Sequence, residues 1–139
     1  MNFSRRDFVA ALLFSGAGAA FAADTTGGGA AADDGGRPVF VVAVIEVKHG
    51  KRAEFIEIFK GNVPNVVAES GCILYEPVVD FNSGIGSQAP LREDVVTVVE
   101  KWASIESLRT HLKAPHMAAY REQVKNLVAN VTLQVMQPA

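Results

Sequence analysis

The sequence has a single cysteine, Cys72, among its 139 residues, so no disulfide can form within the chain. We expect Cys72 to be a buried, unreactive thiol, and stability to come from a hydrophobic core and a second subunit. The net charge is only −2, and no stretch concentrates lysine or arginine. This argues against nucleic acids and anionic membrane surfaces as partners.

The first 22 residues have the features of an export signal. Arg5 and Arg6 precede an apolar run, Phe8–Phe21, which ends in small residues suited to cleavage after Ala22. The run spans roughly 14 residues, fewer than the roughly 20 that cross a bilayer as a helix. We therefore prefer a cleaved signal to an uncleaved membrane anchor. The Ser4–Val9 stretch resembles the twin-arginine export motif, which predicts a bacterial periplasmic or exported protein.

Residues 23–37 separate this signal from the rest of the chain. They are rich in glycine, alanine and aspartate and show no periodicity, which predicts a disordered tether. The Gly27–Gly29 run has no preceding strand and no lysine, so it does not fit a phosphate-binding loop. The remaining residues, 38–139, are enough for one folded domain.

Within this domain, four apolar stretches rich in β-branched residues predict strands at 38–47, 72–81, 95–102 and 131–137. Helical spacing of apolar residues predicts helices at 49–71, 105–112 and 115–128. Gly61 and Pro64 should kink or break the first helix, and Gly71 should stop it. Ser104 is a suitable N-cap for the second helix, and Pro115 suits the first turn of the third. Pro77 favours an edge position or a bulge for its strand.

The order of these elements predicts a ferredoxin-like split βαβ fold of the α+β class, with a four-stranded antiparallel sheet and helices on one face. The first strand is apolar on both faces, so its second face needs cover that this chain lacks. We expect a second copy to provide it, making a homodimer. The polar loop 82–94 is long for a hairpin and is a candidate lid over a pocket.

The segment 100–120 holds most of the residues suited to chemistry. Trp102 ends a strand, and His111, His116 and Tyr120 follow on helical segments. A strand end that feeds a helix with imidazole and aromatic groups can form a pocket with proton-transfer chemistry. In the alternative interpretation, Trp102 is plain core and both histidines are surface or structural residues.

Two stretches carry a resemblance to a known family: GCILYEPVVDF (71–81) and VVEKWASIESLRTHLKAPHMAAY (98–120). They resemble the antibiotic biosynthesis monooxygenase family, which includes small quinol monooxygenases. The resemblance extends over about 39–136. It implies a dimer of ferredoxin-like domains and the oxidation of a small quinol or phenol by molecular oxygen, without a metal or flavin cofactor.

Such a reaction needs a base, a dry pocket and a donor that stabilises developing charge. We interpret His111 as the first candidate base and His116 as the second. Tyr120 is a candidate donor to a substrate oxygen, and Trp102 and Tyr75 are candidate aromatic walls of the pocket. The competing hypothesis is a non-catalytic dimeric or stress-related domain that holds a small hydrophobic molecule in the same pocket.

Other chemistries find less support. His111 and His116 are five residues apart with Pro115 between them, so they should not share one helical face, and no motif completes a metal site. Haem-degrading proteins of similar fold use an asparagine on the first strand, where our placement finds Ala43. Loose haem binding stays open, but haem cleavage does not fit. No arrangement of serine, histidine and aspartate indicates a hydrolase.

Overall fold

The computed structural model describes residues 36–139. The expected export signal lies outside these residues, as does the expected tether except for Gly36 and Arg37. The described elements are β1 (Val39–Val47), α2 (Arg52–Val67), β2 (Cys72–Val78), β3 (Val95–Trp102), α3 (Ile105–Lys113), α4 (Pro115–Val124) and β4 (Val128–Met136). Within 36–139, no helix has the length and apolar character needed to span a membrane.

The four strands form one antiparallel sheet in the order β2-β3-β1-β4. This confirms the predicted fold class. Central strand β1 pairs with β3, so that Val39 lies opposite Trp102 and Ala43 opposite Val98. Strand β2 is an edge strand, which explains how Pro77 is accommodated, because an edge residue can lack an N–H without breaking a ladder on both sides.

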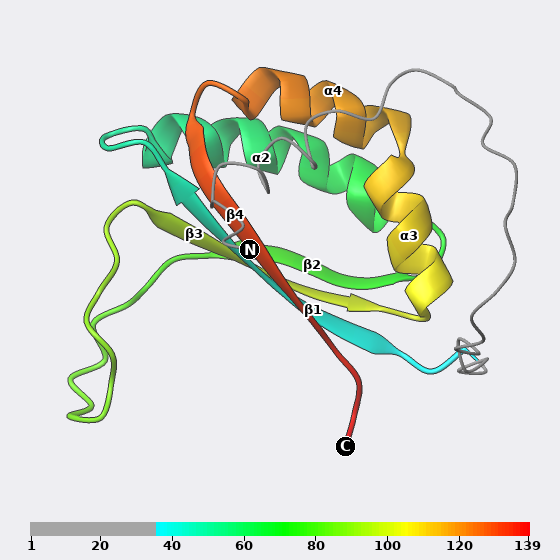
Figure 1. Cartoon of the computed structure of the whole chain (residues 1–139), viewed down its shortest axis with the longest axis horizontal. Helices are drawn as coiled ribbons and strands as arrows, with labels where there is room; N and C mark the ends of the chain where they lie inside the picture. The colour runs from blue at the N-terminus through cyan, green and yellow to red at the C-terminus, as the bar shows by residue number, and fades with distance from the viewer. Residues whose placement is uncertain (1–35) are drawn as a thin grey trace, which may run out of the picture.

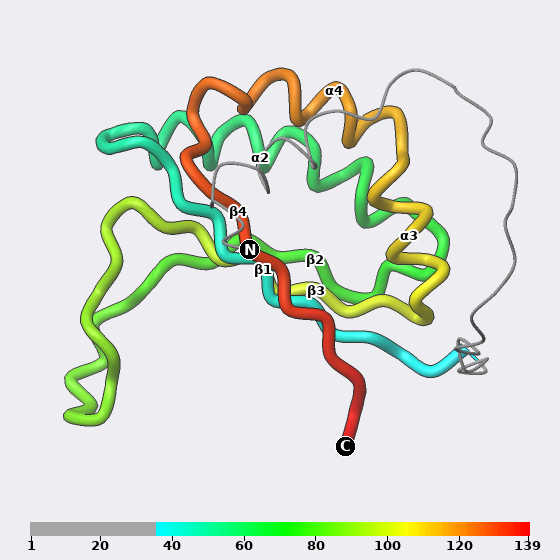
Figure 2. Tube along the Cα trace, viewed as in Figure 1, coloured from blue at the N-terminus to red at the C-terminus, as the bar shows by residue number. Residues whose placement is uncertain are grey.

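The helices cover one face of the sheet and leave the other open (Figure 1). Helices α2 and α4 lie side by side above the strands, and α3 crosses one end of the sheet (Figure 2). Alternate residues of β1 are buried under them, from Val39 to Val47, whereas Phe40 on the opposite face is 36% exposed. The core is therefore one layer thick, between the helices and the upper face of the sheet.

Of the kink or break predicted at Gly61 and Pro64, the structure shows no break. Helix α2 continues through Gly61 and Pro64 to Val67. Proline at this position removes only its own N–H, and because it lies in the last turn, few helical hydrogen bonds depend on it. Helix α4 is shorter than predicted and ends at Val124, because Leu127 and Val128 already join β1 through Lys48 and Val47.

The long loop between β2 and β3 projects away from the helices, at the lower left of Figure 1. Its base is closed by Arg92, whose guanidinium donates to both carboxylate oxygens of Asp80 at 2.7 and 2.8 Å. No residue of this loop lines the cavity described below, so the loop does not act as its lid in this structure.

A close contact at Gly71 joins the start of β2 to the start of α3. Gly71 has φ +86°, and its carbonyl accepts a hydrogen bond from the Ala103 N–H at 2.8 Å. Ser104 then caps α3, because its hydroxyl accepts from the Ser107 N–H at 3.2 Å, as the sequence predicts. These contacts fix the segment just before Gly71, including Glu69, against the first turns of α3.

Candidate active site

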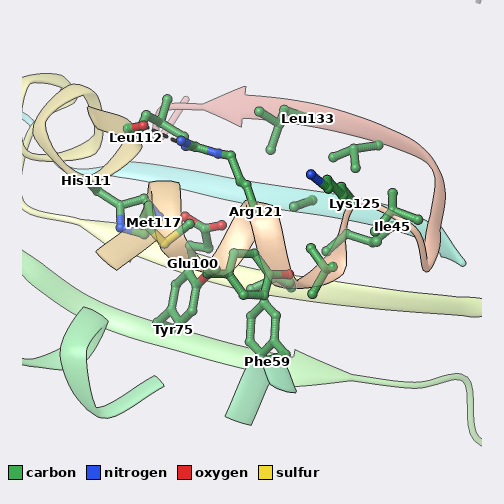
Figure 3. A pocket seen from close by; sticks show the side chains of 16 residues that line it. Ile45, Phe59, Tyr75, Glu100, His111, Leu112, Met117, Arg121, Lys125 and Leu133 are labelled. Carbon is green, nitrogen blue, oxygen red and sulfur yellow. Dashed lines mark hydrogen bonds between the residues drawn. The ribbon is translucent and has the colours of Figure 1, made fainter. Parts of the chain in front are cut away.

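A cavity of about 110 Å³ lies between the sheet and the helices α2 and α4. Most of its wall is apolar, with side chains such as Ile45, Val98 and Leu133 from the sheet. The ionisable side chains of Tyr75, Glu100, His111, Tyr120, Arg121 and Lys125 also line it. Several of them face the same space from different elements (Figure 3). An apolar cavity with a few converging polar groups is typical of a small-molecule site.

His111 is the most buried ionisable group of the cavity, with 1% exposure. It lies in the last turn of α3, tilted against the Trp102 ring with centroids 4.6 Å apart, and it meets the edge of Tyr75 at 5.4 Å. Burial lowers the pKa of His111, and the carboxylate of Glu69 opposes that effect. The imidazole is therefore neutral near pH 7 and able to accept a proton.

Glu69 bridges two histidines with a single oxygen. Its Oε1 lies 3.0 Å from Nδ1 of His111 and 2.7 Å from Nε2 of His116. The bend between α3 and α4 makes this possible: Ala114 has an extended backbone, ψ 140°, as is favoured before proline, and Pro115 starts a new helix. The two histidines therefore converge although they do not share a helical face.

Glu100 is a buried carboxyl group on β3, 5% exposed. It lies two residues before Trp102, so both side chains point to the same face of the sheet, and the indole Nε1–H donates to its Oε2 at 2.8 Å. Burial raises the pKa of Glu100 to about 7, although the hydrogen bond from Trp102 acts in the opposite direction. Near neutral pH this group is thus present in both protonation states.

Aromatic side chains form the floor of the cavity. Phe59 and Tyr75 are stacked with centroids 5.3 Å apart, and Tyr120 meets Phe59 edge-on at 5.7 Å. Burial raises the pKa of both tyrosines, so they stay protonated and can act only as neutral hydrogen-bonding groups. A flat aromatic substrate would find complementary surfaces here.

Arg121 places a positive charge at the cavity wall. Its Nη2 donates to the carbonyl of Leu112 at 2.6 Å, and no carboxylate within residues 36–139 forms an ion pair with it. Figure 3 shows the side chain reaching from α4 towards Leu112 across the cavity. A cation without a counterion beside an apolar space is suited to stabilising negative charge on a ligand.

Comparison with known proteins identifies the family of this domain. The family model described as "Antibiotic biosynthesis monooxygenase" matches residues 38–123. The chain belongs to this family. It is similar to the Escherichia coli (strain K12) protein named "Probable quinol monooxygenase YgiN", with 37% identity over 100 residues that cover 70% of this chain and 95% of that protein.

Solved structures agree on the fold of this monooxygenase-family chain. A protein from Shewanella oneidensis matches with a TM-score of 0.62 and 25% identity, covering 74% of this chain and 92% of its own. A protein from Pseudomonas aeruginosa gives the same TM-score with 18% identity, covering 74% and 95%.

In this antibiotic biosynthesis monooxygenase domain, three of the predicted site residues line the cavity: Tyr75, His111 and Tyr120. Trp102 does not line it, because its fully buried ring lies behind His111 and Glu100. His116 also lies off the cavity wall and contacts Glu69 instead. The structure thus brings the two candidate bases together through a residue to which sequence analysis gave no role.

Sequence reasoning missed Glu69, Glu100 and Arg121. A signal for Glu100 was present, because a carboxylate on the apolar inner face of a strand is unusual. Glu69 precedes a glycine turn, where charged residues are common, so nothing in the sequence distinguishes it. Among the described residues, no group of three or more histidine, cysteine, aspartate or glutamate side chains is arranged to hold a metal ion.

Proposed function

We propose that this chain is a monooxygenase that oxidises a small quinol or phenol with molecular oxygen, without a metal or flavin. The observation that carries the proposal is the buried His111 at the wall of an apolar cavity, with Nδ1 turned to Glu69. No hydrogen bond to its Nε2 is found within residues 36–139, and the proposal assigns this nitrogen to the substrate. The similarity to a protein named as a quinol monooxygenase supports the substrate class.

Proton removal is the first task of the protein. Neutral His111 accepts the phenolic proton on Nε2, and Glu69, 3.0 Å from Nδ1, balances the charge of the imidazolium that forms. The phenolate gives up an electron to oxygen more readily than the phenol does. With a free ring position on the substrate, one oxygen atom enters the ring as a quinone carbonyl. The other oxygen atom leaves as water, and the phenol supplies the four electrons.

Two groups stabilise the negative charge that passes from the phenolate to oxygen. Arg121 supplies a fixed positive charge at the cavity wall, and the protonated form of Glu100 can donate a hydrogen bond. Such preorganised groups act strongly in a cavity from which water is excluded. The proposal therefore gives Arg121 the main electrostatic role.

The size of the cavity limits the substrate. Apolar cavities of roughly 150 Å³ can hold a benzene ring. At about 110 Å³, the cavity here suits one aromatic ring after small side-chain adjustments, rather than a fused polycyclic system. We therefore expect single-ring quinols or phenols as substrates.

Oxygen labelling tests this proposal directly. Purified protein treated with a chelator is supplied with ¹⁸O₂ and a panel of phenols and quinols, beside His111→Gln and His49→Gln. His49 is a matched control, because its side chain is 90% exposed on the surface. We expect one labelled oxygen in the product and one in water, with turnover reduced about a hundredfold or more in His111→Gln only.

Two other results would contradict the proposal. Hydrogen peroxide without label in the product would indicate a quinol oxidase rather than a monooxygenase. Absence of oxygen uptake above background on every substrate would favour a non-catalytic domain that binds a small hydrophobic molecule.

We also propose that two copies of the chain pair through the open face of the sheet. Phe40 and Met136 lie opposite each other on β1 and β4, and both are exposed apolar side chains of that face. A large exposed apolar surface favours association. A monomeric sedimentation coefficient at micromolar concentration would refute the dimer.

Export by the twin-arginine route remains a proposal that rests on residues 1–22. It predicts a mature protein in the periplasmic or secreted fraction, beginning after Ala22. Replacing Arg5 and Arg6 by lysine should retain the precursor in the cytoplasm. Unchanged export of that variant would argue against the twin-arginine route.

A further inference from the structure

Beside the cavity, Glu69, His111 and His116 form a contact in which one carboxylate oxygen meets two imidazole rings. The three residues come from the segment after α2, from α3 and from α4. The same carboxylate oxygen contacts both imidazoles, at 3.0 Å to Nδ1 of His111 and 2.7 Å to Nε2 of His116. Their side chains become gradually more exposed, from 2% for His111 to 15% for Glu69 and 25% for His116.

The hydrogen bond with Glu69 assigns the tautomer of His111. A carboxylate oxygen only accepts, so Nδ1 of His111 carries a proton when it donates to Glu69. Nε2 of His116 lies 2.7 Å from the same oxygen as an ion-pair contact. In neutral His111 the lone pair is then on Nε2, the nitrogen available to the cavity. Nδ1 of His116 is buried and has no hydrogen-bond partner among the described residues.

We propose that Glu69 and His116 are positioning residues that fix the tautomer of His111 and set its strength as a base. This proposal rests on the proposed function, in which His111 removes the substrate proton. Glu69 holds the Nδ1 proton and so keeps Nε2 free to react. His116 contacts the same oxygen from its other side. This contact reduces the effect of the Glu69 charge on His111.

The other charged and titratable groups around His111 do not duplicate this pair. On α4, Arg121 acts on His111 in the same direction as His116 but at the cavity wall. On β3, Glu100 is engaged by Trp102, and on β2, Tyr75 stays protonated. Cys72, also on β2, is a half-buried thiol whose pKa is raised by burial, so it stays neutral. Among these groups, Glu69 is the anion that contacts the imidazole of His111.

The two positioning residues act on His111 with opposite signs. The hydrogen bond and charge of Glu69 raise the pKa of His111, whereas His116 lowers it. Removing Glu69 should therefore weaken the base, and removing His116 should strengthen it. A purely structural role would change both variants in the same direction, or neither.

The test is a titration of the full-length chain labelled with ¹⁵N-histidine, without substrate. The chain has three histidines, so His49→Gln and His116→Leu assign the spectra. We expect the pKa of His111 to fall in Glu69→Gln and to rise in His116→Leu, each by about half a unit or more, which is about a threefold change in proton affinity. The Nδ1–H tautomer should be kept in His116→Leu, where Glu69 still accepts from Nδ1, and lost in Glu69→Leu, which removes the acceptor.

Kinetics supply a second measurement with the same signs. The rate constant kcat/KM should fall below the pKa of His111, so its acid limb should move to lower pH in Glu69→Gln and to higher pH in His116→Leu. If Glu69→Gln does not fold, Glu69→Asp replaces it. This variant keeps the carboxylate charge but moves it away from His111, so the pKa of His111 should fall less than in Glu69→Gln.

The two proposals fail in different ways. An unchanged His111 titration in both variants, or a shift of the same sign in both, overturns the positioning proposal even if the enzyme turns over. Absence of turnover in the wild-type protein overturns the proposed function, while the titration still decides whether the pair controls His111.

Discussion

At the scale of single residues, Glu100 is a carboxyl group buried in a position where its charge is costly. Its pKa of about 7 in the folded protein lies above the ordinary value of 4.5, so the folded state binds more protons than the unfolded state between these values. The stabilisation that protonated Glu100 contributes to the folded state is fully present below pH 4.5. It is lost as the pH rises towards 7. Glu100 therefore opposes folding at alkaline pH.

Replacement by glutamine tests this directly. The free energy of unfolding of the wild-type protein should fall by about 2–3 kcal/mol relative to Glu100→Gln between pH 5 and pH 8. Urea denaturation at several pH values measures the difference. An equal pH dependence in both proteins would mean that Glu100 titrates at its ordinary pKa.

Arg121 is the residue whose replacement should affect turnover without a large effect on folding. Loss of its charge in Arg121→Gln should lower kcat about a hundredfold, because the charge acts on the transition state rather than on the bound substrate. Arg109→Gln is the control, since Arg109 lies exposed on α3 and pairs with Glu106. A rise in KM with unchanged kcat would instead assign Arg121 to substrate binding.

At the scale of elements, Gly71, just before β2, lies against Ser107 of α3. A Cβ atom here would lie 2.6 Å from the Ser107 Cβ, and φ is +86°. Gly71→Ala should therefore lower the free energy of unfolding by about 2–4 kcal/mol. Gly84→Ala provides a matched control with φ +71° and no atom within 4 Å, so it reports the backbone strain alone. Equal losses in the two variants would exclude a steric role for Ser107.

The N-cap of α3 is a second local determinant. Ser104→Ala removes the oxygen that accepts the Ser107 N–H, and should cost about 1 kcal/mol in urea denaturation. Ser104→Asp should retain most of the stability because it can accept the same hydrogen bond. If both variants are equally destabilised, the hydroxyl contributes through another contact, such as that with the Ser107 hydroxyl at 3.1 Å.

The elements that sequence predicted well are those with strong periodicity. Strand β3 has the predicted bounds, because Val95 to Trp102 alternate between the core and the outer face. The ends of α2 and α4 are harder to predict, because tertiary hydrogen bonds decide where a helix stops. Glu69 could not be predicted as a site residue, because its role depends on two helices that meet it from elsewhere in the chain.

At the scale of the whole molecule, the open face of the sheet carries the dimer proposal. Val44 lies on the central strand and points to that face, so Val44→Lys should place a charge in the proposed interface and give a monomer. Val67→Lys is the control, because Val67 is an exposed apolar residue at the end of α2. Sedimentation velocity distinguishes the two variants. A Val44→Lys protein that stays dimeric would place the interface elsewhere.

The bend at Ala114 and Pro115 has a consequence for how such sites are recognised in other sequences. On an uninterrupted helix, each residue turns by about 100°, so side chains five apart would point about 140° away from each other. Spacing rules based on regular helices therefore discard His111 and His116 as a pair. The proline that stands between them in the sequence is the bend that brings both to one carboxylate. A search pattern for related sites should accept two histidines on either side of an X-Pro joint, with an acidic residue from a distant turn.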